Sequence, residues 1–398
     1  NAAAEGVALP LSASLNRQQF GPGDVTFTYT ADYNLTAAIP SSGPVHGGTA
    51  IRLPADGLAG GADYRCRFRG GDATDVTASA ALSAEGDAVL CASPNISVLS
   101  PPGPSGAYNL SVSLNRQQYR GFLPYTFYDV PALSAALPAS GPVAGGAKVS
   151  LRGLHLAGGD NYTCRFGDTQ PLFSPAAYEG GLLTCVAPPA SSAGTRTLRL
   201  AHNAQQYSAS SLPFEYYDAP SVFGISPSSG PARGGTNVTI TGQPLPSQDS
   251  CLYANDGTCD EPFFCAAGTD CTDCATAAQT SCGMASGSAP RCRFGEAGAA
   301  AGTVAGQADG YVLICTAPSA RVTTSIDIGP LEVALNGQQY TSAGGLYTFY
   351  PSPVVSRIEP TGGPIGGGTT LTVSGDGLAG GSDYRCQFGE PTALPSGG

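Results

Sequence analysis

Cysteines are the residues of this chain whose type and spacing could do chemistry, because paired thiols oxidise to disulfides. The 398 residues include 13 cysteines. Three times, a cysteine in a Cys-x-Phe strand is followed by a second in a Cys-x-x-Pro context. This register predicts three disulfides, Cys66–Cys91, Cys164–Cys185 and Cys292–Cys315, each contributing about 3 kcal/mol to stability. Cys386 has the strand context but no return partner.

Disulfides in fixed register indicate an oxidising compartment, whereas the alternative is buried free thiols in a cytosolic protein. The sequons for N-glycosylation favour the first interpretation. They predict N-linked glycans on five asparagines, Asn34, Asn95, Asn109, Asn161 and Asn237. We therefore expect a secreted or cell-surface glycoprotein.

A separate cysteine-rich stretch lies at about 250–283. It contains six cysteines, Cys251, Cys259, Cys265, Cys271, Cys274 and Cys282. The stretch is too short for an apolar core, so we expect three local disulfides of undetermined connectivity to stabilise it as a metal-free knob. Carboxylates between the cysteines leave calcium as an alternative, through Asp256, Asp260, Asp270 and Asp273. Zinc at Cys271 and Cys274 is a third reading, although no second ligand pair completes a tetrahedral site.

Catalysis and cofactor binding are not predicted. The three histidines, His46, His155 and His202, lie at unrelated positions and form no recognisable triad with a nucleophile and a carboxylate. Gly47 and Gly48 lead into a strand rather than a helix, which argues against a phosphate-binding loop. The net charge is −11 and Lys148 is the single lysine, so nucleic acid and membrane surfaces are not expected as partners.

The cysteines belong to a cassette that recurs along the chain. Each copy starts with a Pro-x-x-Gly-Pro-x-x-Gly-Gly opening segment, and later contains an Asn-x-Gln-Gln hairpin followed by an aromatic closing strand. The opening segments are Pro40–Thr49, Pro138–Gly146, Pro227–Thr236 and Pro360–Thr369. The hairpins are Leu15–Phe20, Leu114–Tyr119, His202–Tyr207 and Leu335–Tyr340.

The positions of the opening segments and hairpins predict a first repeat at 34–130, a second at 131–218 and a third at 219–351. The third repeat carries the cysteine-rich insertion. Residues 1–33 read as a C-terminal half-repeat and 352–398 as an N-terminal half-repeat, so we expect a segment of a longer protein. Alternating runs such as Asn237–Thr241 and Gly367–Gly375 predict half-buried antiparallel strands. About seven short strands per repeat indicate an all-β chain of tandem β-sandwiches.

The cassette resembles the IPT/TIG immunoglobulin-like domain. The resemblance rests on the opening segment, the following Gly-x-x-Leu, the Tyr-x-Cys-x-Phe-Gly strand, the Cys-x-x-Pro return and the closing hairpin, and it covers nearly the whole chain. It implies immunoglobulin-like sandwiches similar to those of plexin and fibrocystin-type ectodomains. Together with an alga-like composition, it suggests a flagellar or cell-surface filament glycoprotein of the mastigoneme kind.

Two functions from different classes remain open on sequence grounds. The first is a non-enzymatic structural or adhesive segment that contacts other copies of itself or other extracellular proteins. The second is a receptor-type ectodomain that binds a protein or carbohydrate through clefts between repeats or through the cysteine-rich knob. Proline-containing links at 129–131, 218–220 and 350–353 restrict the freedom between repeats and favour the first. The accessory array of a secreted enzyme is a third alternative.

Overall fold

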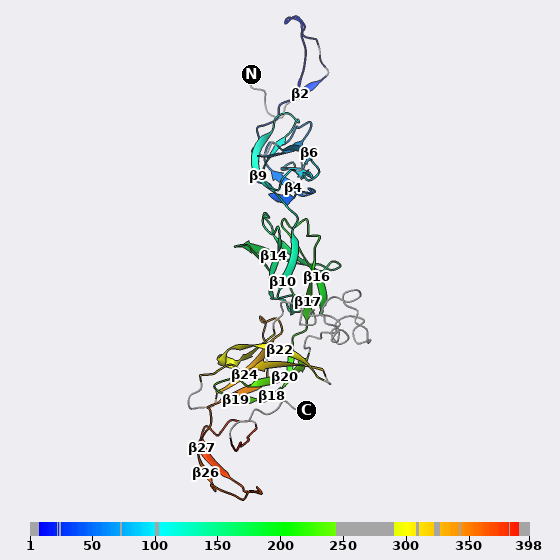
Figure 1. Cartoon of the computed structure of the whole chain (residues 1–398). Helices are drawn as coiled ribbons and strands as arrows, with labels where there is room; N and C mark the ends of the chain where they lie inside the picture. Colours follow the sequence, from blue (N-terminus) through cyan, green and yellow to red (C-terminus); the bar gives the residue numbers. More distant parts are fainter. Residues whose placement is uncertain are drawn as a thin grey trace. The chain divides into compact units, whose positions relative to one another are not determined.

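The regular secondary structure of the described residues is almost entirely β-strand (Figure 1). The computed structural model describes residues 8–243 and 290–389, apart from 22, 24, 72–73, 100–102, 308–309, 322–326, 342–343 and 382. Within these ranges one short 3-10 helix, η1 (Gly295–Ala297), is the only helical element. The prediction of an all-β chain of immunoglobulin-like sandwiches is confirmed, while the exact repeat boundaries stay predictions. The six cysteines of the insertion and the four aspartates proposed for calcium lie outside the described residues.

The chain divides into two compact units, and the division passes through the second repeat. One unit contains Asn1–Ala136, Val149–Ala187 and Arg196–Phe214. The other contains Leu137–Lys148, Pro188–Thr195 and Glu215–Gly398. Residues 41–50, 160–162 and 202–206 lie together in the first of these units, and residues 140–148 and 336–339 lie together in the second.

The first repeat forms a seven-stranded sheet in the order β3-β9-β8-β5-β6-β7-β4. Its strands are β3 (Ser42–Pro44), β4 (Ala50–Pro54), β5 (Arg65–Gly70), β6 (Asp75–Leu82), β7 (Ala88–Ala92), β8 (Gly106–Ser113) and β9 (Arg120–Tyr128). β6 pairs with β5 through its first residues and with β7 through its last three. The sheet thus folds over at β6, and the Cys66–Cys91 disulfide joins β5 to β7 across the fold.

Aromatic residues of the cassette form the centre of this core. Phe68, two positions after the strand cysteine, makes an edge contact with Tyr125 of the closing strand at 5.2 Å between ring centroids. Both rings are fully buried. Phe166 and Phe214 make the same contact in the second repeat at 5.1 Å, as do Phe294 and Tyr347 in the third. The Cys-x-Phe and closing-strand motifs therefore recur because they pack against each other.

The second repeat has equivalents of these seven strands and an eighth strand ahead of its opening segment. Its strands are β10 (Ala132–Leu137), β11 (Ser140–Pro142), β12 (Lys148–Leu154), β13 (Thr163–Phe166), β14 (Leu172–Glu179), β15 (Leu182–Val186), β16 (Gly194–Ala201) and β17 (Leu212–Tyr217). β13 lies between β14 and β16 in an antiparallel arrangement, and β14 continues the pairing to β15. The Cys164–Cys185 disulfide joins β13 to β15.

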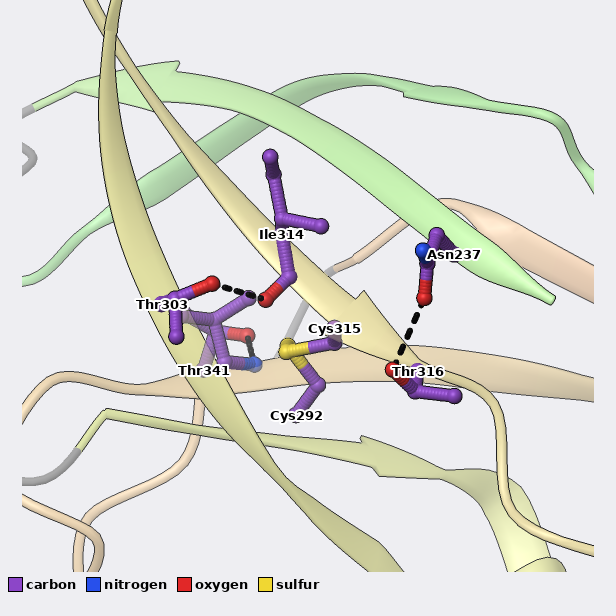
Figure 2. Close-up of a disulfide and its surroundings, with 8 residues drawn as sticks. Asn237, Cys292, Thr303, Ile314, Cys315, Thr316 and Thr341 are labelled. Carbon is purple, nitrogen blue, oxygen red and sulfur yellow. Dashed lines mark hydrogen bonds between the residues drawn. A yellow bond between two sulfur atoms is a disulfide. The ribbon is translucent and has the colours of Figure 1, made fainter. Parts of the chain in front are cut away.

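The third repeat forms an eight-stranded sheet in the order β18-β20-β23-β22-β21-β24-β25-β19. Its strands are β18 (Ser221–Ser226), β19 (Ser229–Pro231), β20 (Asn237–Gln243), β21 (Arg291–Phe294), β22 (Ala299–Gln307), β23 (Gly310–Thr316), β24 (Asp327–Ala334) and β25 (Leu346–Tyr350). The Cys292–Cys315 disulfide lies between β21 and β23 (Figure 2). The half-repeats contribute one strand pair each, β1 (Ala8–Pro10) with β2 (Thr26–Thr28), and β26 (Val354–Glu359) with β27 (Thr372–Asp376).

The opening segment has one conformation throughout. All four copies begin with a cis peptide bond before the proline, and in the full repeats the Ser-Gly-Pro strand pairs in parallel with the closing strand. Gly43 has to be glycine because an added Cβ would overlap the hydroxyl oxygens of Tyr125 and Thr49. Gly48 has a φ of 84°, which lies in the left-handed region that favours glycine. The glycines of the cassette therefore serve a sharp turn and a close strand approach.

Candidate functional site at the junctions between repeats

A tight turn, which we call the Asn-Gln-Gln turn, lies at the tip of each Gln-Gln hairpin. In all four copies the asparagine Oδ1 accepts hydrogen bonds from the backbone N–H groups of both glutamines, at 3.0 to 3.2 Å. The asparagine Nδ2 donates to Oε1 of the second glutamine. The residue between the asparagine and the first glutamine has a positive φ. It is Arg17, Arg116, Ala204 or Gly337 in the four copies. The asparagine therefore fixes the turn locally.

In the first junction, the turn of the second repeat binds the opening segment of the first repeat and Ala50, the first residue of β4. The side-chain amide of Gln205 accepts from the backbone N–H of Ala50 and donates to the carbonyl oxygen of Ala50, both at 3.0 Å. Gln206 Nε2 donates to the carbonyl oxygen of Gly48 at 3.1 Å. Asn203 Nδ2 lies 3.2 Å from the carbonyl oxygen of Ser42. These contacts supply hydrogen-bond partners to backbone N–H and C=O groups that would otherwise need a neighbouring β-strand.

In the second junction, the turn of the third repeat repeats these contacts on the opening segment of the second repeat. Gln338 accepts from the N–H of Lys148 at 2.8 Å and donates to its carbonyl oxygen at 3.0 Å. Gln339 donates to the carbonyl oxygen of Gly146 at 3.0 Å, and Asn336 to that of Ser140 at 3.3 Å. Because the turn recognises backbone atoms, Ala50 and Lys148 can occupy the same position.

The first junction has additional side-chain contacts. The Thr49 hydroxyl donates to Gln206 Oε1 at 3.0 Å and accepts from Asn203 Nδ2 at 3.2 Å. The Asp160 carboxylate accepts from the hydroxyls of Ser41 and Ser42 at 2.8 and 2.7 Å, and also from the Ser41 backbone N–H. An ionised carboxylate with three donors makes stronger hydrogen bonds than a neutral acceptor.

A buried histidine also lies at the first junction. His202 precedes the turn, is fully buried, and packs between the rings of Tyr128 and Tyr162 at centroid distances of 4.6 and 5.0 Å. Neither ring nitrogen has a hydrogen-bond partner among the described residues. Burial lowers the pKa of the His202 imidazole from 6.5 to about 4. The ring is therefore neutral at physiological pH and acts as a packing residue.

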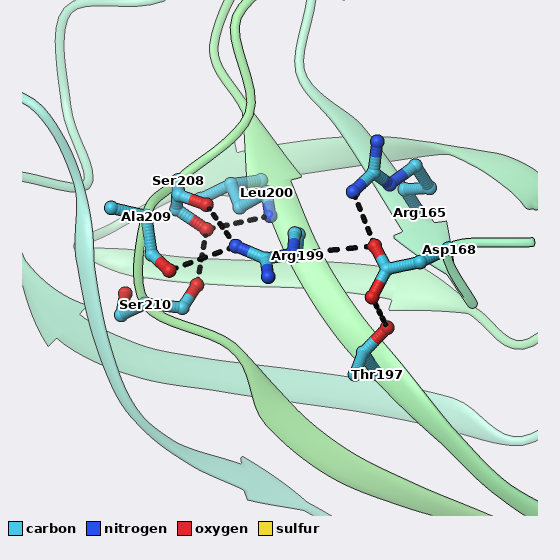
Figure 3. A network of polar contacts seen from close by, with 8 residues as sticks. All are labelled: Arg165, Asp168, Thr197, Arg199, Leu200, Ser208, Ala209 and Ser210. Carbon is cyan, nitrogen blue, oxygen red and sulfur yellow. Dashed lines mark hydrogen bonds and ion pairs between the residues drawn. The ribbon is translucent and has the colours of Figure 1, made fainter.

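Within the second repeat, a polar network holds the turn in position (Figure 3). The Arg199 guanidinium donates to the carbonyl oxygens of Ser208 and Ala209 at 2.9 and 2.8 Å, just after the turn. Asp168 lies 3.5 Å from Arg199 and accepts from Arg165 at 2.6 Å. A hydrogen bond from the Thr197 hydroxyl, with the two guanidinium groups, lowers the pKa of the Asp168 carboxyl.

A cation–π contact recurs beside the turn in every full repeat. Arg165 lies over the ring of Tyr207, the aromatic residue that follows the turn, at 4.7 Å. Arg67 over Tyr119 and Arg293 over Tyr340 are the equivalent pairs, at 4.1 and 4.5 Å. These pairs fix the base of each turn to the strand that carries the disulfide cysteine.

The residues that the sequence analysis named as candidates, where the structure describes them, lie at different places and do not form one site. The five sequon asparagines are all exposed, and Asn237 accepts a hydrogen bond from Thr316 (Figure 2). His46 contacts Ser97, and His155 faces Asp129 at 3.8 Å. Cys386 is exposed. The described residues contain no cluster of histidine, cysteine and carboxylate side chains that could hold a metal ion, and no helix among them is long and apolar enough to cross a membrane.

Sequence reasoning did not identify the junction residues as a site. It used the two glutamines as markers of the repeat, and it gave Asp160 no role. The sequence does contain a signal for this site, which is the recurrence of two glutamines at the tip of each hairpin. Side chains at a hairpin tip do not pack in the core of their own repeat, so core packing does not explain why the glutamines recur. Such a recurrence points to a contact outside the hairpin itself.

Known proteins share the domain and parts of the sequence. The IPT/TIG domain matches residues 131–216, 220–272 and 353–396. Plexin A3 of Danio rerio is 27% identical over 214 residues, covering 53% of this chain and 11% of that protein. Plexin-B3 of Homo sapiens is 33% identical over 125 residues, covering 29% of this chain and 6% of that protein.

A solved structure of the extracellular region of plexin A4 aligns with 84% of this chain and 26% of that chain, at 16% identity and a TM-score of 0.39. The chain thus spans only a small part of the length of these relatives. The domain match and the plexin similarity agree with the sandwiches and disulfides described above. The chain therefore contains IPT/TIG immunoglobulin-like domains, is similar in sequence to parts of plexins, and is of the extracellular kind.

Proposed function

We propose that this chain is a non-enzymatic structural or adhesive segment of a cell-surface protein, in which Asn-Gln-Gln turns fix consecutive repeats to each other. The observation that carries the proposal is the recurrence of one hydrogen-bond set at both junctions, on Ala50 and on Lys148. A contact that binds backbone atoms can be reused along an array whose side chains vary. The disulfides in each repeat support an oxidising exterior setting.

The absence of catalysis is part of the proposal. The contacts of the three histidines support it, because His202 packs between two tyrosine rings and the other two make single polar contacts near the surface. The five exposed sequon asparagines are proposed to carry N-linked glycans. A flagellar filament, suggested by the composition together with the cassette, is the specific location that immunogold labelling of the producing cells would test.

Removing the glutamine amides tests the proposal in the full chain. We expect Gln205→Ala/Gln206→Ala to accelerate hydrogen exchange of the Ala50 amide by about tenfold, because each lost hydrogen bond contributes about 1 kcal/mol. Gln338→Ala/Gln339→Ala should do the same at Lys148. The control is Gln18→Ala/Gln19→Ala, since that turn contacts no opening segment among the described residues. Unchanged exchange at both amides would refute the role of the turns.

A receptor-type ectodomain is the second candidate, favoured by the similarity to plexins. It requires a protein or carbohydrate ligand that binds saturably to the monomeric protein. Electron microscopy of the intact protein separates the two functions: regular lateral assembly supports the structural role. Isolated particles together with saturable binding of a soluble ligand support the receptor.

A further inference from the structure

A recess of about 530 Å³ lies where the first repeat meets the second, inside one of the two compact units. From the first repeat it is lined by residues 105–106 and 126–129. From the second repeat it is lined by residues 153–158, Tyr178 and Gly181. A recess of this volume is large enough for a small organic ligand.

One residue of the recess, His155, replaces a glycine of the cassette. The sequence Gly-Leu-Ala-Gly-Gly recurs at 57–61 and 377–381 and reads His-Leu-Ala-Gly-Gly at 155–159. The backbone φ at this position is 74° at Gly57, 68° at Gly377 and 55° at His155. A residue with a Cβ is strained in this left-handed region, whereas glycine is not. The second repeat therefore has a strained histidine at a position where the fold alone favours glycine, and such strain is typical of functional positions.

The recess has an apolar part, formed by Leu154 and the ring of Tyr178. Leu154 is 66% exposed, and the equivalent residues of the other copies are Asp56 and Asp376. Core packing therefore does not explain the leucine. The Tyr178 ring stacks on the ring of Tyr162, with centroids 5.8 Å apart and 26° between the ring planes. A supported aromatic ring beside an apolar side chain suits the C–H face of a ring-shaped ligand.

The polar part of the recess consists of a carboxylate, a hydroxyl and an imidazole. Ser105 Oγ donates to Asp129 Oδ2 at 2.7 Å, and His155 Nδ1 lies 3.8 Å from the same oxygen. About half of each side chain of the Asp129–His155 pair is exposed, so both can still bind a ligand. A carboxylate accepts hydrogen bonds, and a neutral imidazole donates one and accepts one. No lysine or arginine lines the recess among the described residues, so nothing there would attract an anionic ligand.

We propose that this recess binds a neutral saccharide. Hydroxyl groups of the sugar ring donate to the Asp129 carboxylate and bond to the His155 imidazole, while the C–H face of the ring packs on Tyr178 and Leu154. Because Asp129 belongs to the first repeat and His155 to the second, the bound sugar contacts both repeats. The proposal rests on the receptor-type function, the second candidate above, and names its ligand class and its site.

Titration of the full chain with methyl glycosides of glucose, galactose, mannose and N-acetylglucosamine tests the proposal, after treatment of the chain with an N-glycosidase. We expect saturable shifts of the NMR signals of the Gly106 and Gly158 amides with at least one of these sugars. Asp129→Asn should weaken binding about tenfold, because it replaces charge-assisted hydrogen bonds with neutral ones. Tyr178→Ala should weaken binding by at least as much, since it removes the stacking surface.

His155→Gly is the sharpest variant, because it restores the residue that the cassette has elsewhere. It should raise the melting temperature by relieving the left-handed strain, and it should weaken saccharide binding about tenfold by removing the imidazole. The matched control is Arg116→Gly. Arg116 also has a positive φ, of 63°, and it lies outside the recess. This control should also raise the melting temperature but should leave saccharide binding unchanged.

Three results would overturn the proposal: no shift of the two glycine amides with any of the sugars, binding that persists in both Asp129→Asn and His155→Gly, or equal weakening by Arg116→Gly. A chain that binds a soluble protein saturably but no saccharide would keep the receptor function and lose only this site. A chain that binds neither and assembles laterally would show that the receptor function itself fails.

A free polysaccharide and a glycan on another protein are two sources of such a saccharide. Oligosaccharide fragments of a cell-wall polysaccharide and N-glycans released from a glycoprotein are the probes that separate them. The set that binds more tightly at the Gly106 and Gly158 amides identifies the source, and either result supports the site.

Discussion

The first and second junctions share one set of contacts and differ in several side chains around it. Both use two glutamine amides and one asparagine amide on backbone groups of the opening segment. Among the residues that the structure describes, only the first adds the Thr49 hydroxyl, the Asp160 carboxylate and the buried His202. The second has Ala147 in place of Thr49 and Leu335 in place of His202. The shared contacts define the repeat array, while the added ones distinguish one junction from another.

The largest expected difference between the junctions is their response to acid. Well above pH 6.5 the His202 imidazole is neutral in both the folded and the unfolded chain. Between pH 6.5 and about 4 the unfolded chain binds a proton while the buried ring does not, so the stability contributed by His202 is lost progressively in that window. Since each pKa unit corresponds to about 1.4 kcal/mol, we expect a loss of about 3 kcal/mol.

Calorimetric unfolding at pH 7.5 and pH 4.5, for wild type and His202→Leu, measures this loss. Leucine is the residue at the equivalent positions 114 and 335, so the substitution makes the first junction resemble the second. The wild type should lose stability relative to His202→Leu as the pH falls. The titratable side chains of Tyr128 and Tyr162 contact the ring, and the backbone N–H of Asp160 donates to the carbonyl oxygen of His202. Parallel melting temperatures at both pH values would exclude a depressed His202 pKa.

Replacing the asparagine of each turn should have the next largest effect, and a similar one at both junctions. Asn203→Ala removes the acceptor for two backbone N–H groups and the donor to Ser42, and Asn336→Ala does the same to the second junction. Leaving buried polar groups unsatisfied costs about 2 kcal/mol. Hydrogen exchange of the Gln205, Gln206, Gln338 and Gln339 amides provides the measurement.

The exposed turn is the matched control, because Asn115→Ala removes the same internal hydrogen bonds, and this turn contacts no opening segment in the part of the chain that the structure describes. Its effect should stay local to Gln117 and Gln118. If Asn115→Ala destabilises its repeat as much as Asn203→Ala, the asparagine serves the hairpin alone and the shared contact set would need a different explanation.

The sequence predicted most of the fold because the fold-determining residues recur. Cys-x-Phe, Cys-x-x-Pro and the aromatic closing strand returned in register, and each of them packs within its own repeat, as Phe68 packs on Tyr125. Both residues of a contact within one repeat recur in every full copy of the cassette. The cassette therefore specified the all-β sandwich class directly, and the structure contains the three predicted cysteine pairs.

The junctions were harder to predict for a physical reason. Gln205 binds the backbone of Ala50, and Gln338 that of Lys148, so the partner side chains carry no shared signal. The partners also belong to different copies of the cassette, and no periodic pattern says which copy is the neighbour. Asp160 has no counterpart at the equivalent Ala62, so its contact with Ser41 and Ser42 could be found only from the structure.

The smallest expected difference concerns one hydroxyl and can be tested in both directions. Thr49→Val keeps the shape of the side chain but removes the hydroxyl that bonds to Asn203 and Gln206, and it should destabilise the first junction by about 1 kcal/mol. Ala147→Thr introduces the same hydroxyl near Asn336 and Gln339 and should stabilise the second junction by less, since the buried site must also accept the added methyl group.

Ala147→Val is the control for added volume without a hydroxyl, and exchange of the Ala50 and Lys148 amides is the measurement. If Ala147→Thr and Ala147→Val slow or accelerate exchange at Lys148 equally, volume rather than hydrogen bonding decides the effect, and the hydroxyl does not distinguish the junctions. If only Ala147→Thr slows exchange, a single side chain is enough to give the second junction the additional hydrogen bonding of the first. That outcome requires the turns themselves to be equivalent, because a hydroxyl can strengthen the second junction only if Asn336 and Gln339 lie as Asn203 and Gln206 do.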